Sequence, residues 1–573
     1  MKKRIITSLL FLGIIPIIVL GGSSCTFEDI LDHSSEKRKE LDNGKNNEKE
    51  YDFVITPENA KGDFRTFFQN VVRTHNNVLI KNGTYEIELI SWRGISPKDG
   101  CTITFEENAK IKVKANRLEA YSLLDLRGRK NITLINPTIE GDKYIHLDYR
   151  GQWGHGINLS DCSNIRIHNA NITKFWGDGI YINNSENIKI YNPYISDNRR
   201  QGISIISGND IEIHNLIVEN TGGTSPGYGI DVEPNWNGEN VTGLRIYKPI
   251  FRNNGNGKET LPVGFCLSTH GAMTINPKIG RLVESKIDIE IFDPVFEGDM
   301  LYIIPHNDQI KGKLKIHSPV FKNSKNTAIY FRDHQSNSFS TEIINPKLID
   351  CVQSLEKSIY LAPILFYCSK KGIKKNGSKN ILIKNPTITG SKNGKYNNFV
   401  AIRNIGTDFF SDDMKNVSIS NLTVKGYEKI FYNHGGLPSN ISNLHPDFSL
   451  SINEKSELPT IPLDFSVSKT LNGATVNHSY GKENSIIYLS REIPVSGFEF
   501  FYTNDSKDSS SLKLIFGTKK KPTKAFISKW GANEFSGIEI PYGGFIKLKK
   551  SKVDKQGEHW TIVEASKDVK GIK

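Results

Sequence analysis

The chain has 573 residues, of which 37% are hydrophobic and 24% are charged, and it contains 48 glycines and 23 prolines. This composition is typical of a turn-rich soluble fold and argues against a protein with many membrane spans. The length exceeds what one compact core supports, whereas a solenoid lengthens by adding coils. The formal net charge of +12 favours a polyanionic partner (acidic polysaccharide, nucleic acid or anionic lipid), but solubility alone explains it equally well.

The N-terminus has the pattern of an export signal. A basic start precedes an apolar stretch over residues 5–20, and small residues then lead to Cys25. The pattern resembles a bacterial lipoprotein signal, which implies lipidation of Cys25, although Gly22 stands where such signals usually carry leucine. We therefore expect a signal peptide over residues 1–24 and, because the next segment is charged and poor in large apolar groups, a flexible tether over residues 25–50. Plain secretory cleavage and an uncleaved anchor are the alternatives.

An export signal of this kind implies a location outside the cytoplasm. The expected place is a bacterial outer membrane or cell surface, with the periplasmic face as an alternative. The membrane is then a partner through the N-terminal lipid.

Five cysteines follow Cys25. They show no CxxC spacing and their number is odd, so neither a zinc site nor a complete disulfide framework is expected. Single buried thiols are the simplest expectation for these five, Cys101, Cys162, Cys266, Cys351 and Cys368.

An amphipathic helix is expected near the start of the remaining chain. Asp63 has the character of an N-cap, and the helix should run to about His75. Its apolar residues recur at helical spacing and define one stripe: Phe64, Phe67, Phe68, Val71 and Val72. Residues 78–85 then predict strand, turn and strand. A helix ahead of a Gly-Thr-Tyr turn resembles the N-terminal cap of pectin-lyase-like β-helix proteins, where it would cover the open end of the core.

A short strand pattern then recurs about ten times. Each copy alternates apolar and polar residues, turns at a polar corner that is often Asn-Pro, and returns to an apolar residue. A period of 20–50 residues is the signature of a solenoid, and loops of varying length leaving one corner commonly build its binding face. Some asparagines of the repeat match the Asn-x-Ser/Thr pattern of glycosylation sites. They are interpreted instead as residues at the corners of the coils and in ladders of stacked asparagines. The copies begin at or near Asn131, Asn164, Asn187, Asp210, Gly243, Ile287, Lys313, Thr341, Asn380 and Asn416.

Four segments between Trp153 and Asn235 can be laid over one another, at spacings of 23, 23 and 27 residues. In each, a glycine precedes an alternating strand, so the aliphatic residues point to one face and the residues between them to the other. The register assigns four isoleucines to the core: Ile157, Ile180, Ile203 and Ile230. It assigns four other residues to the outer face: Asn158, Tyr181, Ser204 and Asp231. We expect four adjacent coils whose outward columns form the active site.

Together, the repeat, the cap and the strand pattern resemble right-handed parallel β-helix proteins of the pectin-lyase-like superfamily, over about residues 51–450. The resemblance implies an all-β fold of about ten coils with a sugar chain bound across the parallel sheet. Members of the superfamily include polysaccharide lyases, glycoside hydrolases and polyuronate epimerases. We place the β-helix at residues 51–452.

The polar segment 453–462 contains two prolines and marks a domain boundary. Residues 463–573 lose the repeat but still alternate, which predicts a small C-terminal β-sandwich-like domain. Its basic runs are interpreted as solvated turns, with carbohydrate binding or oligomerisation as an alternative role.

No single enzyme family within the superfamily is matched by its motifs. Polygalacturonase-type hydrolases carry a Gly-His-Gly turn after an aspartate pair, but here the turn at His155 precedes Asp178 and no aspartate pair aligns. The lyase motif Arg-x-Arg-Gly-Pro is absent from the sequence. The segment 231–235 is only loosely similar to the Asp-Pro-His-Glu stretch of alginate epimerases. The resemblance therefore implies fold and substrate class, without a catalytic set.

The candidate acids and bases come from the outward columns. Asp231 and Glu233 are two apart on one strand, so both point outward with Cα atoms about 6.5–7 Å apart. Inverting glycosidases hold two carboxyls roughly 6.5–9.5 Å apart. Asp178 lies two coils earlier, displaced by about 10 Å. Like charges on one face should raise at least one pKa and provide a general acid. A turn residue between two glycines is the alternative for Asp178, and a Ca²⁺ site is the alternative for the set.

Other outward groups complete the expected site. His155 heads the column of Asp178 and is an acid/base candidate, while Tyr181 is placed to stack on a sugar or to act as a base in a lyase. Arg200 is expected to hold a substrate carboxylate or sulfate through its fork, or else to pair with a neighbouring aspartate. Weaker candidates for extending the groove are Tyr330, Arg332, His334, His270, His306 and Asp308.

Aromatic residues flank the four turns. Tyr228 lies in the column of His155, and three of the six tryptophans stand beside the turns. Sugars stack on aromatic faces, so this clustering favours a glycan groove, and packing under loops is the alternative. The expected substrate-binding aromatics besides Tyr181 are Tyr228, Trp153, Trp176 and Trp236.

The sequence thus favours an exported lipoprotein that degrades polysaccharide. The preferred hypothesis is a glycoside hydrolase that acts on an acidic glycan, with Asp178, Asp231 and Glu233 as its acid/base carboxyls. One alternative is a polysaccharide lyase in which Arg200 neutralises a uronic acid. The other is a glycan-binding or adhesive β-helix without activity. No cofactor is expected to be required. Nucleic acid is not an expected partner because the basic residues are scattered.

Overall fold

The computed structural model describes most of the chain beyond residue 50. The expected signal peptide, the tether and Cys25 lie outside the described residues. Within the described part, no helix is long and apolar enough to span a membrane. The described ranges are 51–255, 261–306, 308–353, 361–368, 378–390, 400–405, 414–427, 429–434, 449–452, 466–467, 475–478, 485–489, 499–504, 512–518, 521–522, 524–527, 534–541, 545–554 and 557–572.

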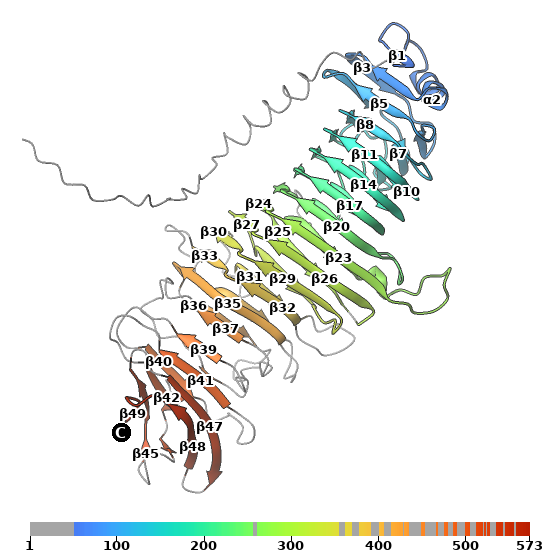
Figure 1. Cartoon of the computed structure of the whole chain (residues 1–573). Coiled ribbons are helices and arrows are strands. Elements are labelled where there is room, and N and C mark those ends of the chain that lie inside the picture. Colours follow the sequence, from blue (N-terminus) through green and yellow to red (C-terminus); the bar gives the residue numbers. More distant parts are fainter. Residues whose placement is uncertain are drawn as a thin grey trace, which may run out of the picture. The chain divides into compact units, whose positions relative to one another are not determined.

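The chain begins with the expected cap. Helix α2 runs over Phe64–Thr74, and the Asp63 carboxylate accepts a hydrogen bond from the Thr66 backbone N–H at 3.0 Å. This N-cap satisfies one of the donors that the first turn leaves unpaired. Four residues of the predicted stripe are buried in the core cluster, and Phe67 packs against it, so the helix covers the apolar end of the strands that follow (Figure 1).

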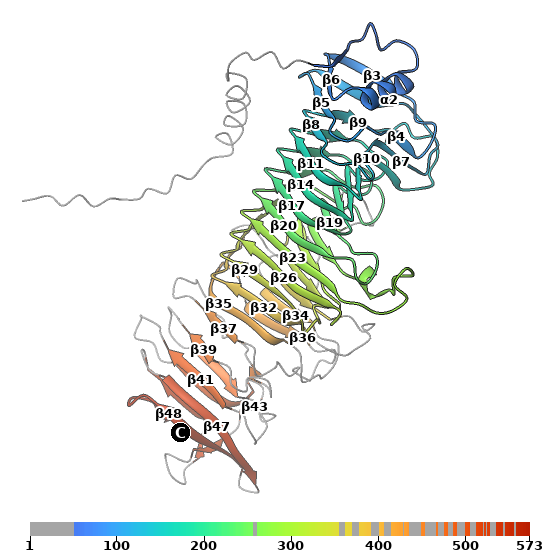
Figure 2. The same ribbon diagram turned by 45° about the vertical axis from the view of Figure 1, so that its right-hand side comes forward.

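Three parallel sheets make up the coils, so each coil contributes one strand to each sheet (Figure 1). Sheet 1 contains β1 (Phe53–Ile55), β2 (Asn77–Ile80), β5 (Thr102–Phe105), β8 (Thr133–Ile135), β11 (Ser163–His168), β14 (Ser185–Tyr191), β17 (Gly208–His214), β20 (Val241–Tyr247), β23 (Ser285–Phe292), β26 (Ile310–His317), β29 (Phe339–Ile344), β32 (Lys379–Lys384) and β35 (Lys415–Lys425). Figure 2 shows this ladder face-on. Every predicted copy from Asn131 to Asn416 coincides with one of its strands. Strands β1, β2 and β5 lie ahead of the first predicted copy.

Sheets 2 and 3 complete each coil. Sheet 2 contains β3 (Gly83–Ile87), β6 (Ala109–Val113), β9 (Thr138–Glu140), β12 (Asn171–Thr173), β15 (Tyr194–Ser196), β18 (Ile217–Glu219), β21 (Ile250–Arg252), β24 (Val295–Glu297), β27 (Val320–Lys322), β30 (Lys347–Ile349) and β33 (Thr387–Thr389). Sheet 3 contains β4 (Arg93–Ile95), β7 (Ala120–Asp125), β10 (Trp153–Ser160), β13 (Ile180–Asn183), β16 (Ile203–Ile205), β19 (Ile230–Val232), β22 (Val263–Ser268), β25 (Met300–Ile304), β28 (Ile329–Arg332), β31 (Ile364–Tyr367), β34 (Val400–Ile405) and β36 (Lys429–His434). A short 3₁₀ helix, Gly271–Met273, follows β22.

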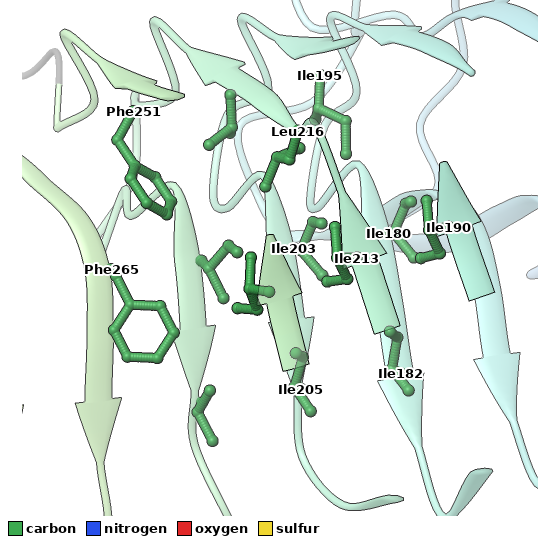
Figure 3. Packing of buried hydrophobic residues seen from close by; sticks show 14 of the residues in the cluster. Ile180, Ile182, Ile190, Ile195, Ile203, Ile205, Ile213, Leu216, Phe251 and Phe265 are labelled. Atoms are coloured by element: carbon green, nitrogen blue, oxygen red, sulfur yellow. The ribbon is translucent and has the colours of Figure 1, made fainter. Parts of the chain in front are cut away.

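The core runs through the middle of these coils. Ile157, Ile180, Ile203 and Ile230 face one another in register and are fully buried, as predicted, and Phe265 continues the row. Figure 3 shows such rows stacking coil on coil. Burial of one such side chain contributes about 1.5–3 kcal/mol. The five cysteines beyond Cys25 are free and buried, as expected.

The polar corners form ladders of asparagine side chains. Asn192 has a positive φ of 51°, donates to the Asn169 side chain at 3.0 Å and accepts from the Asn215 side chain at 2.8 Å. Asparagine tolerates the left-handed conformation because its short amide bonds locally. Of the asparagines that match the glycosylation pattern, Asn131 and Asn416 are such corner residues, with ladder bonds to Asn164 and Asn380, whereas Asn171 lies inside β12.

Replacing Asn192 by alanine is expected to lower the free energy of unfolding by about 1–3 kcal/mol, from two lost amide bonds and left-handed strain. Urea unfolding of the purified protein measures the loss. Asn192→Gly is the matched variant, because it loses the same bonds without the strain at Cβ and should be less destabilising than alanine. Equal stability of wild type and Asn192→Ala would contradict the assignment.

Beyond the ten predicted copies, parallel pairing continues before the order changes. Strands β37 (Ser449–Ile452), β39 (Thr475–His478) and β41 (Glu499–Asn504) extend sheet 1, and β38 (Ser466–Val467), β40 (Ser485–Leu489) and β42 (Leu512–Thr518) pair in parallel beside them. Antiparallel pairs then involve β43 (Lys521–Pro522), β44 (Ala525–Ile527), β45 (Glu534–Phe535), β46 (Gly537–Ile540), β47 (Phe545–Asp554), β48 (Gly557–Ala565) and β49 (Lys570–Ile572).

The C-terminal strands have a hydrophobic cluster of their own, centred on the fully buried Trp560. The expected boundary at residues 453–462 lies outside the described residues, so the limits of the C-terminal domain stay a prediction.

Candidate active site

The outer face of sheet 3 carries the candidate site. Parallel pairing places Asn158, Tyr181, Ser204 and Asp231 in one column, in the predicted register. Backbone bonds link the coils just before these strands, from Gly156 to the Asp178 carbonyl and onward, so His155, Asp178, Gln201 and Tyr228 form a neighbouring column. Glu233 follows β19 directly and lies two residues after Asp231, on the same side.

Arg200 joins two of the three predicted carboxylates. Its Nη1 donates to Asp178 Oδ2 at 3.0 Å, and its Nη2 donates to Glu233 Oε1 at 2.9 Å. Only 12% of the Arg200 side chain is exposed, against 22% for Glu233 and 0% for Asp178. The structure thus brings together carboxylates from coils that are far apart in sequence. The pairing of Arg200 with Asp178 agrees with the alternative expected from the sequence, and the substrate-binding role of Arg200 stays a prediction that this pairing does not favour.

Two residues without a predicted role complete the network. Gln201 Nε2 donates to Asp231 Oδ2 at 2.5 Å, and Ser204 donates to Asp178 Oδ2 at 2.9 Å. Ser204 also contacts the Gln201 side-chain oxygen, which in turn accepts from Arg200 at 2.9 Å. The signal that could have found Gln201 and Ser204 was the register itself, since both stand in the predicted columns.

Burial and charge act differently on the three carboxyls. Burial, and then the charge of Glu233, raises the pKa of Asp231 well above its usual range. Burial also raises the pKa of Glu233, but the Arg200 guanidinium opposes that rise. The same two effects act on the pKa of Asp178, which is raised overall. Asp231 is therefore the carboxyl most disposed to hold a proton, and Asp178 and Glu233 are those that Arg200 favours as anions.

His155 lies against this cluster as a neutral group. Its Nδ1 is 3.3 Å from the Asp178 backbone N–H, and its ring stacks on Tyr181 with centroids 5.0 Å apart. Burial, followed by the charges of Arg200 and Arg127, lowers the pKa of His155 to about 3. Burial and the nearby carboxylates raise the pKa of Tyr181 to about 12. Both shifts favour the neutral form of the side chain at pH 7, which disfavours His155 as a general acid there.

The three tryptophans differ in their placement. Trp153, at the start of β10, is 48% exposed, and Trp236, in the segment after β19, is 37% exposed, so both remain available to a ligand. Trp176 is only 8% exposed: its ring stacks on His146 at 4.0 Å, and the Arg199 guanidinium lies 3.7 Å from its centroid. The expected stacking of Trp176 on substrate is therefore wrong for this structure, because protein groups cover its ring.

Some of the weaker candidates also lie elsewhere than expected. His334 does not alternate outward with Tyr330 and Arg332, because β28 ends at Arg332 and Asp333 turns the chain with a φ of 48°. His334 is fully buried, and its Nε2 lies 2.8 Å from Thr341 Oγ1. Asp308 bonds to the Asn337 backbone N–H at 2.7 Å. Arg332 and Tyr330 do remain on the outer face of sheet 3.

The alternative of a Ca²⁺ site stays a prediction that the geometry does not favour. In the part of the chain that the structure describes, no group of three or more metal-ligating side chains is arranged to hold an ion. Arg200 supplies the positive charge between Asp178 and Glu233 that a cation would otherwise supply.

Comparison with known proteins identifies the fold. Residues 68–242 match a family model described as a right handed beta helix region. The chain is a right-handed parallel β-helix protein, as the repeat and the resemblance predicted. No curated protein sequence matches it significantly.

Solved structures with the same architecture have very different names. The A-module of the mannuronan C-5 epimerase AlgE4 of Azotobacter vinelandii is 11% identical, over 67% of this chain and 98% of that one, with a TM-score of 0.46. The catalytic unit of a GH87 alpha-1,3-glucanase of Streptomyces thermodiastaticus is 12% identical, over 71% and 68%, with a TM-score of 0.41. The surface adhesin PfbA of Streptococcus pneumoniae is 13% identical, over 89% and 98%, with a TM-score of 0.31. At these values the likenesses carry nothing about activity.

Proposed function

We propose that this protein is a glycoside hydrolase that cleaves a polysaccharide lying across sheet 3. The observation that carries the proposal is the pair of neighbouring carboxyls, Asp231 and Glu233, of which only Glu233 bonds to the Arg200 guanidinium, while burial and the charge of Glu233 raise the pKa of Asp231 well above its usual range. Two carboxyls with divergent pKa values are what acid and base assignments in a glycosidase require.

Asp231 is the proposed general acid. Burial and the charge of Glu233 raise its pKa well above the usual range, which favours the protonated carboxyl. Gln201 donates to its Oδ2, and the Cys266 thiol also bonds to this carboxyl, whose residue is 2% exposed. From this carboxyl a proton would pass to the glycosidic oxygen.

Glu233 is the proposed general base. Its side chain is the most exposed of the three carboxyls, and the Arg200 guanidinium at 2.9 Å favours its anionic form. An anionic carboxylate beside a protonated one can take a proton from water as that water attacks the sugar carbon. Asp178 is a positioning residue, because it is fully buried and holds Arg200 from the other side.

The lyase alternative is less well supported by the same contacts. β-Elimination at a uronic acid needs a cation to neutralise the substrate carboxylate, and Arg200 is already paired with two protein carboxylates. Neutral His155 stays available as a base in such a reaction.

The choice of an acidic glycan as substrate rests on the net charge of +12. Export and lipidation at Cys25 remain part of the proposal on the sequence pattern alone.

Incubation with a panel of polysaccharides tests the reaction class. The panel comprises polygalacturonate, alginate, hyaluronan and a neutral α-glucan. A hydrolase releases new reducing ends without ultraviolet absorbance, whereas a lyase also produces the absorbance of an unsaturated uronic acid. Binding of any of these glycans without new reducing ends would overturn the enzymatic proposal in favour of an adhesive β-helix.

The pH dependence of kcat/KM is expected to be bell-shaped. Activity should fall with decreasing pH as Glu233 takes up a proton, at a pKa above the usual glutamate value of about 4.3, because burial raises it. Activity should fall with increasing pH as Asp231 loses its proton, at a still higher pKa. Initial rates measured across the pH range test both limbs. A profile that keeps rising to alkaline pH would contradict the assignment of Asp231 as the acid.

A further inference from the structure

A second group of side chains gathers on the outer face of sheet 3, beyond the carboxylates. Its members form a small apolar cluster separate from the solenoid core, with Cys266, Tyr302 and Tyr330 in the column of Asp231. The Tyr302 and Tyr330 rings stack with centroids 4.9 Å apart, and Tyr330 meets Tyr367 edge to face at 6.3 Å. We call Tyr302, Tyr330 and Tyr367 the tyrosine platform.

An arginine stands at this platform. Strand pairing places Arg332 in the same column as Glu233, three coils further along, which corresponds to about 14 Å at one strand spacing per coil. Tyr330 precedes Arg332 by two residues on β28, so both side chains point outward. The column that carries the exposed base therefore also carries a cation.

Arg332 is held in place but not enclosed. Its Nη1 donates to Tyr302 Oη at 2.9 Å, and its Nε lies 3.6 Å from Asp333 Oδ2. These contacts use two of the five N–H donors of a guanidinium, and 44% of the side chain is exposed. Arg200 differs in both respects, because it is 12% exposed and lies between two carboxylates.

Arg332 is the partly exposed cation beside the tyrosine platform, whereas Arg403, two coils beyond Tyr330, is buried. Burial lowers the pKa of the adjacent His306 to about 4, and the charge of Arg332 acts in the same direction, so that imidazole is neutral at pH 7. A planar guanidinium with free donors binds carboxylate or sulfate through its fork. Tyr302 is buried against Tyr330, so the half-buried Tyr330 and Tyr367 are the rings that a sugar beside Arg332 would contact. The combination fits a sugar unit that carries an anionic substituent.

We infer that Arg332 and the tyrosine platform form a subsite for a carboxylate- or sulfate-bearing sugar unit, three coils from the proposed catalytic pair. The inference rests on the proposed function, because it assigns the charge of the glycan that the catalytic carboxyls would cleave.

Calorimetric binding to the full-length Glu233→Gln protein, in which turnover is blocked, tests the subsite. The probes are an oligogalacturonate, its fully methyl-esterified form and a sulfated galactan oligosaccharide. Adding Arg332→Gln is expected to weaken binding of one or both anionic probes about tenfold and to leave the ester within about twofold. The anionic probe that loses affinity identifies carboxylate or sulfate as the recognised group. Tyr330→Leu should instead weaken the anionic probe and the ester alike.

Arg245→Gln is the matched control, since Arg245 lies on sheet 1 between Asp288 and Glu290 and should not change binding. Unchanged affinity for both anionic probes in Arg332→Gln, or equal losses for the acid and its ester, would overturn the subsite and leave the catalytic proposal intact. Arg332-dependent binding by a protein that releases no reducing ends from any glycan would instead support the subsite and overturn the hydrolase. A parent protein that binds none of the probes would overturn the subsite.

Discussion

The Asp231→Asn variant is expected to lose at least about 100-fold in kcat, the usual scale for removal of a general acid. Asparagine keeps the shape of the side chain and its contact with Gln201 but cannot donate a proton to a glycosidic oxygen. The pH profile provides the sharper readout, because the limb that falls with increasing pH belongs to Asp231 and should vanish from the residual activity. Release of reducing ends across the pH range measures both effects.

A buried aspartate elsewhere in the solenoid is the control for this substitution. Asp299 is fully buried, burial raises its pKa to about 7, and it bonds to the Asn254 side chain at 2.6 Å. Asp299→Asn should retain activity, because the residue is not part of the carboxylate cluster. Asp231→Asn should fold as stably as the wild type, since it removes an acid that burial disfavours as an anion. Full activity of a folded Asp231→Asn protein would exclude Asp231 as the acid.

The repeat made much of this site predictable. In a parallel solenoid, residues at equal positions in successive repeats become neighbours, so the spacings of 23, 23 and 27 residues sufficed to place Tyr181, Ser204 and Asp231 in one column. Alternation then decided which side chains face the core. Both signals are local or periodic, and both were confirmed.

The remaining features depend on contacts that no period encodes. Arg200 follows a turn in the chain, and whether it binds a substrate or the carboxylates of Asp178 and Glu233 depends on its rotamer and on its burial. Trp176 is covered because the segment containing His146 lies over it, which is a matter of loop path. The carboxyl pKa values follow from the same burial and pairing. The period of the sequence therefore predicts which column a residue occupies, whereas its partners, its burial and its pKa depend on packing.

Arg200→Met is expected to lower the free energy of unfolding at pH 7 by about 3 kcal/mol, because it leaves the fully buried carboxylate of Asp178 and the partly buried carboxylate of Glu233 without their cation. Arg245→Met is the matched control. Arg245 also bridges two carboxylates, at 2.9 and 3.2 Å, but these groups are partly exposed on sheet 1, so its loss should cost less than about 1 kcal/mol.

The pH dependence of the Arg200→Met loss distinguishes an electrostatic cause from simple loss of packing. Without the guanidinium, only hydrogen bonds from Ser204 and Gln201 oppose the rise that burial imposes on the pKa of Asp178 and Glu233. A carboxyl whose folded-state pKa is raised is well tolerated at low pH, where it is neutral in both states, and destabilises the fold as pH rises through that value. The deficit relative to wild type should therefore be smaller near pH 4 than at pH 7, as measured by urea unfolding at both. A deficit of equal size at the two values would mean that Arg200 stabilises the coils by packing, and the electrostatic pairing that keeps Glu233 anionic would have to be abandoned.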